Sequence, residues 1–248
     1  MIPKIIHYCW FGGQPLPKSA IKCINSWRKF LPDYEIKEWN ESNFDVNSID
    51  YTRQAYELKK YAFVSDYARF WILYNYGGLY FDTDVEIIRP LDDIIETGPF
   101  MGIEVPANES DGTLPMVAPG LGLGAEAKMS FYKEVLDYYE SLSFVDADGN
   151  VIPGTVVSHN TKMLSDNGLK ANNNIQIISG IHIYPKDYFN PLDDATGRLF
   201  KTENSRAIHW YDKTWVDNYG PIRKWLSRIV HRILGTDFPS KVKKLFHK

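Results

Sequence analysis

The segment from Thr52 to Asp84 constrains the fold more than any other part of this 248-residue sequence. Apolar side chains recur there at helical spacing, at Phe63, Tyr67, Phe70, Leu73 and Tyr74. This spacing predicts one helix over Thr52–Tyr76, and Gly77 stands where a left-handed cap would end it. The run Leu79–Phe81 is too apolar for a half-exposed strand, so we expect a central strand that is covered on both faces. A long helix followed at once by a buried strand favours the α/β class.

The rest of the pattern extends this interpretation to a single α/β domain. Lys4–Phe11 predicts a first strand, the helical spacing after Pro17 lasts until Pro32, and Tyr34–Trp39 predicts a second strand. Strand, helix and strand at this spacing indicate a βαβ unit with parallel pairing. Further helices are expected over Ser130–Leu142, Thr155–Ser165 and Asp217–Leu234, further strands over Phe100–Glu104, Ile175–Ile178, Ile181–Tyr184 and Arg206–Trp210, and a long loop near the cleft over Pro106–Gly120.

Composition and charge exclude several classes of protein. No run approaches the roughly 18 apolar residues of a membrane span, and the first residues lack the layout of a signal peptide. Cys9 and Cys23 are too few for a disulfide framework and wrongly spaced for a metal knuckle, so we expect free thiols and a cytoplasmic protein. Residues 221–248 hold eight Lys and Arg but one Asp, whereas the whole chain has a charge of −3. Residues 1–220 are therefore acidic, which argues against nucleic acid as the main partner.

Asp82 and Asp84 are candidate ligands of a divalent cation. They follow Gly77-Gly78 and the apolar strand, and alternation would place both carboxylates on one face at the strand's carboxyl end. Hard oxygen ligands favour magnesium or manganese over zinc. His209, after a predicted late strand, is a plausible third ligand. The alternative is a solvated turn, because an Asp-x-Asp sequence is common by chance.

Two further segments could contribute to the same cleft. Asp66 and Arg69 are neighbours on the predicted helix, either as a plain intrahelical salt bridge or as a pair that grips sugar hydroxyls. Trp10, before Gly12-Gly13, could stack on a nucleotide base or belong to the core. Gly120–Ala125 fits a dinucleotide-binding pattern, but it follows Pro119 in mid-chain and no clear first strand, which disfavours a nicotinamide site.

Taken together, the segments Ile5–Gly13, Ser65–Arg69, Gly77–Asp84 and His209 with Thr214-Trp215 resemble glycosyltransferase family 32. This family includes bacterial capsular polysaccharide transferases and the yeast outer-chain mannosyltransferase. The first three blocks are also similar to the glucosyltransferase domain of the large clostridial toxins, and Tyr184–Phe189 followed by Ala207–His209 looks like the bacterial capsular branch.

The resemblance implies a GT-A fold, that is, one Rossmann-like domain with a mixed, mainly parallel sheet, here over residues 1–220, before a basic helical tail over 221–248. It implies a nucleotide-sugar donor, a manganese or magnesium ion and retention of anomeric configuration. The expected catalytic residues are Asp66, Arg69 and Asp84, the expected donor-binding residues are Trp10, Ser65, Asp66, Arg69, Tyr80, Asp82, Thr214 and Trp215, and the expected metal ligands are Asp82, Asp84 and His209. The toxins have a glutamate where this chain has His209, and Thr214 stands where the family usually has serine.

The leading hypothesis is a metal-dependent retaining enzyme that moves a hexose from a nucleotide-diphosphate sugar to a surface or capsular glycan. A uridine diphosphate sugar is the first choice of donor, and guanosine diphosphate mannose is the alternative. Two other classes stay open. Leu79–Asp84 also resembles the first motif of haloacid-dehalogenase-type phosphatases, and the fold could serve a non-catalytic glycan-binding protein.

The basic C-terminal segment predicts a contact with anionic membrane. Ile222, Trp225, Leu226, Ile229, Ile233 and Leu234 recur at helical spacing with Arg and Lys between them. The alternative is a helix packed on the domain with its charges in solvent. A basic amphipathic end is attracted to anionic lipid, and lipid-linked glycan acceptors lie at the inner face of the membrane. We therefore expect a cytoplasmic protein that can dock there.

Overall fold

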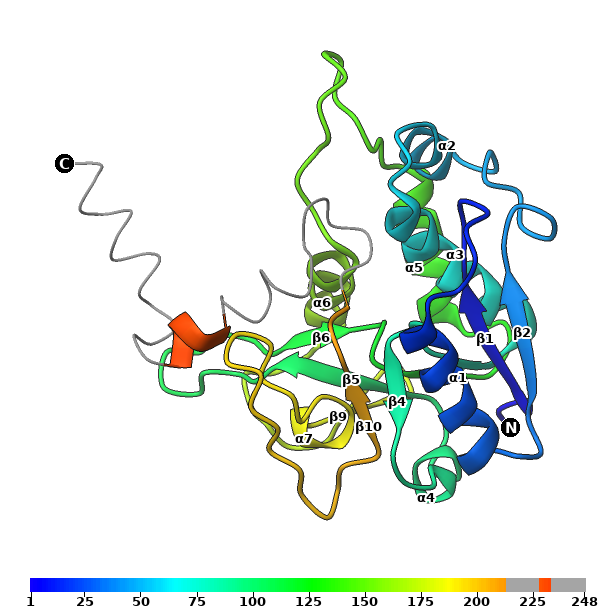
Figure 1. Ribbon diagram of the computed structural model, residues 1–248. Coiled ribbons are helices and arrows are strands. Elements are labelled where there is room, and N and C mark those ends of the chain that lie inside the picture. Colours follow the sequence, from blue (N-terminus) through cyan, green and yellow to red (C-terminus); the bar gives the residue numbers. More distant parts are fainter. Residues whose placement is uncertain (213–227, 233–248) are drawn as a thin grey trace.

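The computed structural model describes residues 1–212 and 228–232 of the chain (Figure 1). The elements in chain order are β1 (Ile5–Cys9), α1 (Lys18–Phe30), β2 (Glu35–Trp39), α2 (Asp50–Glu57), α3 (Tyr61–Tyr76), β3 (Gly78–Tyr80), β4 (Val85–Ile87), α4 (Asp92–Ile95), β5 (Phe100–Val105), β6 (Met116–Ala118), β7 (Leu123–Ala125), α5 (Ser130–Glu140), α6 (Val156–Asp166), β8 (Gln176–Ile178), β9 (Ile181–Tyr184), α7 (Lys186–Phe189) and β10 (Ala207–His209). Residues 228–232 add a short helical segment.

An eight-stranded sheet forms the centre of the described part of the chain. Its order is β2-β1-β3-β7-β5-β9-β8, with β6 paired to β5. The strands β2, β1 and β3 are mutually parallel, as are β5 and β9, and β7 joins the two groups by antiparallel pairing on both sides. The strands of the two parallel groups thus run in one direction, whereas β6, β7 and β8 run in the other. The predicted α/β class with a mixed, mainly parallel sheet is confirmed.

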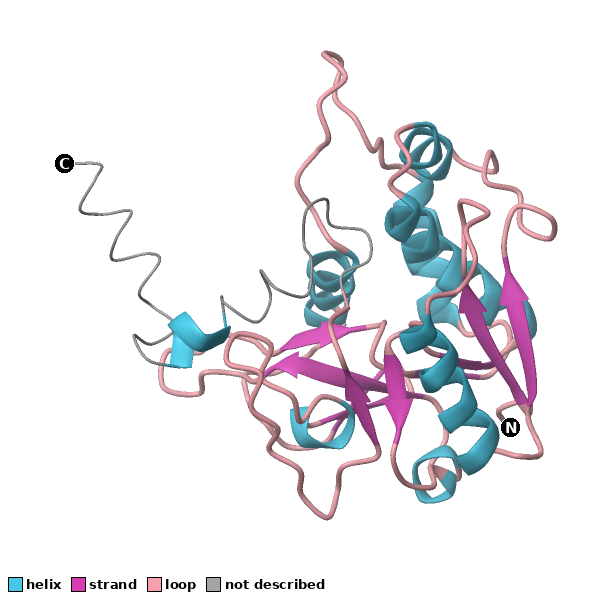
Figure 2. Ribbon diagram, viewed as in Figure 1, coloured by secondary structure: helices cyan, strands magenta, loops and turns pink. Residues whose placement is uncertain are grey.

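Helices cover both faces of this sheet (Figure 2). Because successive side chains of a strand point to opposite faces, Leu79 packs in one buried cluster with Trp27 of α1, while Tyr80 packs in another with Phe70 of α3. Each of these side chains is fully or almost fully buried. The prediction of a central strand covered on both faces is therefore confirmed.

The predicted helix over Thr52–Tyr76 is wrong as a single helix. The chain forms α2 and α3 instead, and Lys59 lies between them with a φ of 57°. The backbone N–H groups of Lys59 and Lys60 donate to the carbonyls of Tyr56 and Ala55, at 2.9 and 2.8 Å. These are the paired bonds of a Schellman cap. A lysine in the left-handed region ends α2 here, where a sequence pattern leads one to expect glycine.

Two other local expectations need correction. The predicted loop Pro106–Gly120 contains β6, and the glycine-rich segment after it contains β7. The predicted strand through Phe81 ends at Tyr80, because the chain then leaves the sheet and returns as β4. There β4 pairs with β10 in a separate two-stranded sheet. The expected strands near residues 175–184 are present as β8 and β9.

The C-terminal expectations fall mostly outside the described residues. Of the predicted helix Asp217–Leu234, residues 228–232 are described, and they are helical. The predicted boundary between residues 220 and 221, and the tail from 233 onward, lie outside the described part of the chain. Within the described residues, no helix combines the length and apolar character needed to cross a membrane. Cys9 and Cys23 are free, as predicted, and both are buried.

Candidate active site

The two aspartates lie in the turn that connects β3 of the large sheet to β4 of the small one. The prediction that both lie on one face of a strand is therefore wrong, because β3 ends before them. The amide of Asp82 donates to the carbonyl of Gly120 at 3.1 Å, and the amide of Val85 donates back to the carbonyl of Asp82 at 3.0 Å. The turn stands at the edge where the parallel strands β1, β3 and β5 end, which is where α/β sheets bind ligands.

Asp82, Asp84 and His209 form a group that could hold a metal ion, and this set of three residues is called the metal group. One ligand atom from each lies within 4.8 Å of the others. His209 comes from the end of β10, which pairs with β4 so that His209 stands opposite Val85. Its Nε2 lies 3.1 Å from Oδ1 of Asp84. The structure thus brings together the three predicted metal ligands, although His209 lies far along the chain from the aspartates.

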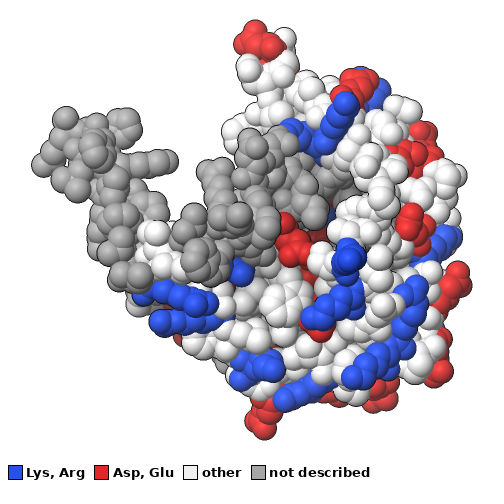
Figure 3. All heavy atoms as spheres, viewed as in Figure 1, with Lys and Arg blue, Asp and Glu red and all other residues white. Residues whose placement is uncertain are grey.

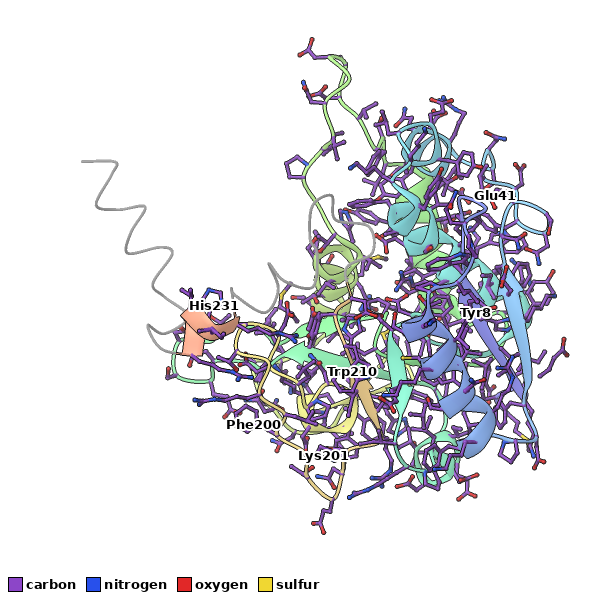
Figure 4. All side chains as sticks on the ribbon, viewed as in Figure 1. Tyr8, Glu41, Phe200, Lys201, Trp210 and His231 are labelled. Atoms are coloured by element: carbon purple, nitrogen blue, oxygen red, sulfur yellow. The ribbon has the colours of Figure 1, made fainter. Side chains whose placement is uncertain are left out.

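Several bonds hold Asp84 in place. The amide of Asp212 donates to its Oδ2 at 2.9 Å, and the amide of Trp210 donates to its backbone carbonyl at 3.0 Å. Next to it, the carbonyl of Val85 accepts a hydrogen bond from the buried indole of Trp27 at 2.7 Å. Trp210 follows β10 directly (Figure 4), and its indole donates to Glu86 of β4 at 2.8 Å. Helix α1 and strand β10 therefore clamp the turn from two sides.

Asp66 and Arg69 form a buried pair that reaches the metal group. Arg69 Nη2 lies 3.0 Å from Oδ1 of Asp66, and both side chains are less than a tenth exposed. Arg69 Nη1 also lies 3.4 Å from Oδ1 of Asp82. The hydroxyl of Tyr80 donates a hydrogen bond to the same Asp82 oxygen at 3.2 Å, and the guanidinium of Arg69 lies over the Tyr80 ring. The pair is thus an intrahelical salt bridge that also contacts Asp82, and its binding of sugar hydroxyls stays a prediction.

Burial and charge set the protonation of these groups. Burial raises the pKa of Asp66 to about 7, because lost solvation outweighs the attraction of Arg69. Burial likewise raises the pKa of Asp82. For Asp84 burial acts in the same sense, but the neighbouring His209 outweighs it and lowers the pKa. Burial opposes the charged form of His209, yet Asp84 raises its pKa to about 9. Without a cation, the site is an acidic group balanced by a protonated imidazole and Arg69.

The residues fit a divalent cation. Two carboxylates supply hard oxygen ligands, and the Nδ1 atom of His209 is buried with no hydrogen-bond partner among the described residues. Tyr80 and the amide of Asp212 bond to the carboxylates from behind, as groups around a metal site do to orient its ligands. A cation and the proton of His209 would compete for the same imidazole.

The other predicted donor residues surround this group or lie outside the described chain. Trp10 is partly exposed at the end of β1, and its indole donates to the carbonyl of Gln14 at 2.5 Å. Ser65 donates to the carbonyl of Tyr61, and its own carbonyl accepts from Arg69 at 3.0 Å. Thr214 and Trp215 fall outside the described residues.

The loop after β1 is fixed to the loop after β2. The amide of Gly12 donates to Glu41 Oε1 at 2.6 Å, and Figure 4 shows Glu41 next to the turn of the β1 loop. A Cβ on Gly12 would lie 2.4 Å from the ring of Tyr61. Trp10 therefore stands on an anchored loop at the edge of the site.

Gly120 is a site residue that the sequence analysis missed. A Cβ built on Gly120 would lie 2.0 Å from Oδ2 of Asp82 and 3.2 Å from Nη1 of Arg69. Gly120 is the first glycine of the segment Gly120–Ala125, for which a nicotinamide site is disfavoured. Here the missing side chain of Gly120 leaves room for Asp82. Figure 3 shows acidic atoms gathered at the centre of this face of the molecule.

Known proteins are similar to this chain in sequence and in fold. Residues 17–101 match the family described as "Glycosyltransferase sugar-binding region containing DXD motif". The chain carries a DXD-type glycosyltransferase region. The match includes α1, the Asp66–Arg69 pair and both aspartates of the turn. It confirms the predicted resemblance to glycosyltransferases.

Two yeast mannosyltransferases are similar to this chain in sequence. Inositol phosphoceramide mannosyltransferase 3 of Schizosaccharomyces pombe is 35% identical over 98 residues, which cover 38% of this chain and 27% of that protein. Inositol phosphoceramide mannosyltransferase 1 of the same yeast is 27% identical over 122 residues, 45% of this chain and 36% of that protein. The chain thus spans well under half the length of these relatives. Among solved structures, the PaToxG glycosyltransferase is similar at 17% identity and a TM-score of 0.48, over 66% of this chain and 69% of that one.

Proposed function

We propose that this glycosyltransferase region transfers a hexose from a nucleotide-diphosphate sugar to a glycan acceptor, with a divalent cation and with retention of configuration. The observation that carries the proposal is the convergence of Asp82, Asp84 and His209 within 4.8 Å beside the buried Asp66–Arg69 pair. A cation bound to the three ligands would act as a Lewis acid on the leaving diphosphate. Manganese or magnesium suits the carboxylate oxygens.

The chain's own residues would bind and orient the donor. Arg69 bonds to both Asp66 and Asp82, so it fixes the carboxylate of the pair relative to the metal group. A buried carboxylate and guanidinium can grip sugar hydroxyls by charge-assisted hydrogen bonds. The partly exposed indole of Trp10 is available to stack on the base. Thr214 and Trp215 are proposed to close over the diphosphate.

We propose a front-face mechanism. The predicted catalytic residues Asp66, Arg69 and Asp84 each have a fixed partner inside the site. None of them is assigned as a covalent nucleophile. The leaving phosphate oxygen would accept the proton of the acceptor hydroxyl as the new bond forms on the same face of the sugar.

Two donors remain candidates. The resemblance to toxin glucosyltransferases favours a uridine diphosphate sugar. The relatives named as mannosyltransferases favour guanosine diphosphate mannose, and their similarity reaches 35% identity. The acceptor is proposed to be a surface or lipid-linked glycan, and the enzyme to work at the cytoplasmic face of a membrane, where the basic residues 221–248 would contact anionic lipid.

A panel of nucleotide sugars with manganese tests the proposal. Donor hydrolysis and thermal stabilisation are measured for uridine and guanosine diphosphate sugars, each with and without the metal. We expect one donor to be hydrolysed only with manganese, and Asp84→Ala to abolish turnover at saturating metal. Stabilisation by guanosine diphosphate but not uridine diphosphate would select the mannose donor. Release of phosphate from a simple phosphoester with no nucleotide-sugar hydrolysis would instead favour a phosphatase, and tight sugar binding without hydrolysis would favour a glycan-binding protein.

A further inference from the structure

Glu104 lies at an irregularity of the central sheet beside the metal group. Strand β5 pairs with β6 at Ile103–Val117 and at Val105–Met116, so one extra residue, Glu104, interrupts the ladder between them. Such a bulge re-aims a side chain and is frequent next to active sites. Because β5 runs in the same direction as β1 and β3, the bulge stands at the edge of the sheet where Asp82 is found.

Tyr211 is held next to Glu104 in an unusual backbone conformation. Its φ of 53° lies in the left-handed region, which costs energy for a residue with a bulky side chain. Its ring packs on His209 with a centroid separation of 4.2 Å. Its hydroxyl hydrogen-bonds to Glu104, and the negative charge of Glu104 acts on both Tyr211 and His209. The strained turn thus places a tyrosine between Glu104 and a predicted metal ligand.

Asn190 contacts both Tyr211 and Glu104. It is fully buried, and its Nδ2 donates to the hydroxyl of Tyr211 at 2.6 Å and lies 3.4 Å from the carbonyl of Glu104. Its Oδ1 has no hydrogen-bond partner among the described residues. A buried amide oxygen without a partner costs free energy, so its presence calls for a reason other than stability. A bulge, a left-handed tyrosine and an unsatisfied asparagine therefore meet at one point of the molecule.

The proposed donor contacts leave Glu104 unused. Arg69 is bonded to Asp66 and to Asp82. Glu104 is partly exposed, and its carbonyl lies 3.4 Å from the Asn190 amide that bonds to Tyr211, the residue packed on His209. A carboxylate in that position is suited to accept a hydrogen bond from an incoming hydroxyl. Its interaction with Tyr211 would hold it in one orientation.

We propose that Glu104 binds and orients the attacking hydroxyl, which is the acceptor's in transfer and water's in hydrolysis. The inference rests on the proposed function. In the step, the bond between the anomeric carbon and the diphosphate oxygen breaks, and its electron pair leaves with the diphosphate. The hydroxyl oxygen forms the new bond to that carbon, and its proton passes to the leaving phosphate. Before the step, the hydroxyl donates its one hydrogen bond to Glu104. As the new bond forms, that proton turns to the leaving phosphate, which takes it, and Glu104 keeps its own charge.

The test compares Glu104→Gln, Glu104→Asp and Glu109→Gln in the full chain. Glu109 is an exposed glutamate five residues further along, so its substitution is a matched control. Binding of uridine and guanosine diphosphate with manganese is measured by calorimetry, and hydrolysis of the preferred nucleotide sugar gives kcat and KM. For Glu104→Gln we expect nucleotide affinity and donor KM within twofold of wild type and kcat at least tenfold lower. Glu104→Asp, which keeps the carboxylate, should recover part of that loss, and Glu109→Gln should match wild type.

Three results would overturn the inference. The first is a kcat within twofold of wild type for Glu104→Gln. The second is a loss of nucleotide affinity that parallels the loss of turnover, since it would mean that the substitution disturbs the metal group. The third is a Glu104→Asp variant that is no more active than Glu104→Gln, which would show that the site does not require the carboxylate. A wild-type protein that hydrolyses no nucleotide sugar would contradict the proposed function itself, which is a distinguishable outcome.

Discussion

The indole nitrogen of Trp39 donates a hydrogen bond to Nδ1 of His7 at 3.0 Å, inside the sheet between β2 and β1. An indole can only donate, so Nδ1 must be an acceptor and the proton of neutral His7 is on Nε2. That nitrogen lies 3.0 Å from the carbonyl of Gly77, to which it donates. His7 is thus fixed as one neutral tautomer on β1, the strand next to the edge strand β2, and its ring is bonded to the residue that precedes β3.

The protonation of His7 should make stability depend on pH. Burial lowers the pKa of His7 from 6.5 to about 4. The unfolded chain therefore binds this proton at a higher pH than the folded one, and the stabilisation present above pH 6.5 is lost as the pH falls toward 4. Between pH 7.5 and pH 4.5 we expect His7 to contribute a loss of about 2.5 kcal/mol in the free energy of unfolding.

Urea unfolding of wild type and His7→Asn at the two pH values measures this contribution. Asparagine offers an acceptor for the Trp39 indole but does not titrate, so the variant removes the His7 part and keeps that of the carboxylates. An equal pH dependence in both proteins would contradict the assignment.

Asp84→Asn should lower turnover at least about a hundredfold at saturating manganese, because the variant removes a charged oxygen ligand from the metal group. Steady-state donor hydrolysis over a manganese series provides the measurement. Asp33→Asn is the matched control, since Asp33 forms an exposed ion pair with Lys4 and, among the described residues, belongs to no group that could hold a metal. Wild-type activity in Asp84→Asn would remove Asp84 from the metal site.

Gly120→Ala should displace Asp82, because the new Cβ would lie 2.0 Å from Oδ2 of that carboxylate. We expect manganese affinity and turnover to fall at least about tenfold. The control is Gly149→Ala in an exposed turn, where φ is 82° and no atom lies within 4 Å of the added Cβ. That variant should cost about 1 kcal/mol of stability through backbone strain but leave metal binding intact. Unchanged manganese affinity in Gly120→Ala would show that Asp82 does not bind the metal.

Trp27→Phe should destabilise the protein by about 1 to 3 kcal/mol, because it removes the donor that serves the buried carbonyl of Val85. Urea unfolding reports the change, and Trp71→Phe removes the same atoms from a ring that is only partly buried. Turnover of Trp27→Phe should also fall, since Val85 follows Asp84 directly. If the two variants were equally stable, the Trp27–Val85 bond would contribute nothing measurable.

The parts of the site that could be predicted are those with a local pattern. Asp82 and Asp84 follow a glycine pair and an apolar strand, so their position at a strand end is legible from neighbouring residues alone. The Asp66–Arg69 pair is likewise visible as a helical spacing. For His209 the residue pattern offered only a plausible third ligand after a predicted late strand, because no local rule relates positions so far apart.

The parts that could not be predicted depend on contacts across the sheet. Gly120 matters because β7 brings it against Asp82, and Glu104 because a bulge forms against β6. The break after α2 was missed for a different reason. Lys59 adopts a left-handed conformation that sequence patterns reserve for glycine, and the bonds of Lys59 and Lys60 compensate its cost.

The pairing of β10 with β4 determines when, during synthesis of the chain, the candidate site can form. Asp84 obtains its partners His209 and Asp212 from a segment made well over a hundred residues later. A nascent chain that has emerged only through β9 has every strand of the large sheet but lacks His209 as a ligand for a cation. The site can therefore assemble only after residues 209–212 have left the ribosome, and a metal ion bound there would stabilise a contact between segments far apart in the chain.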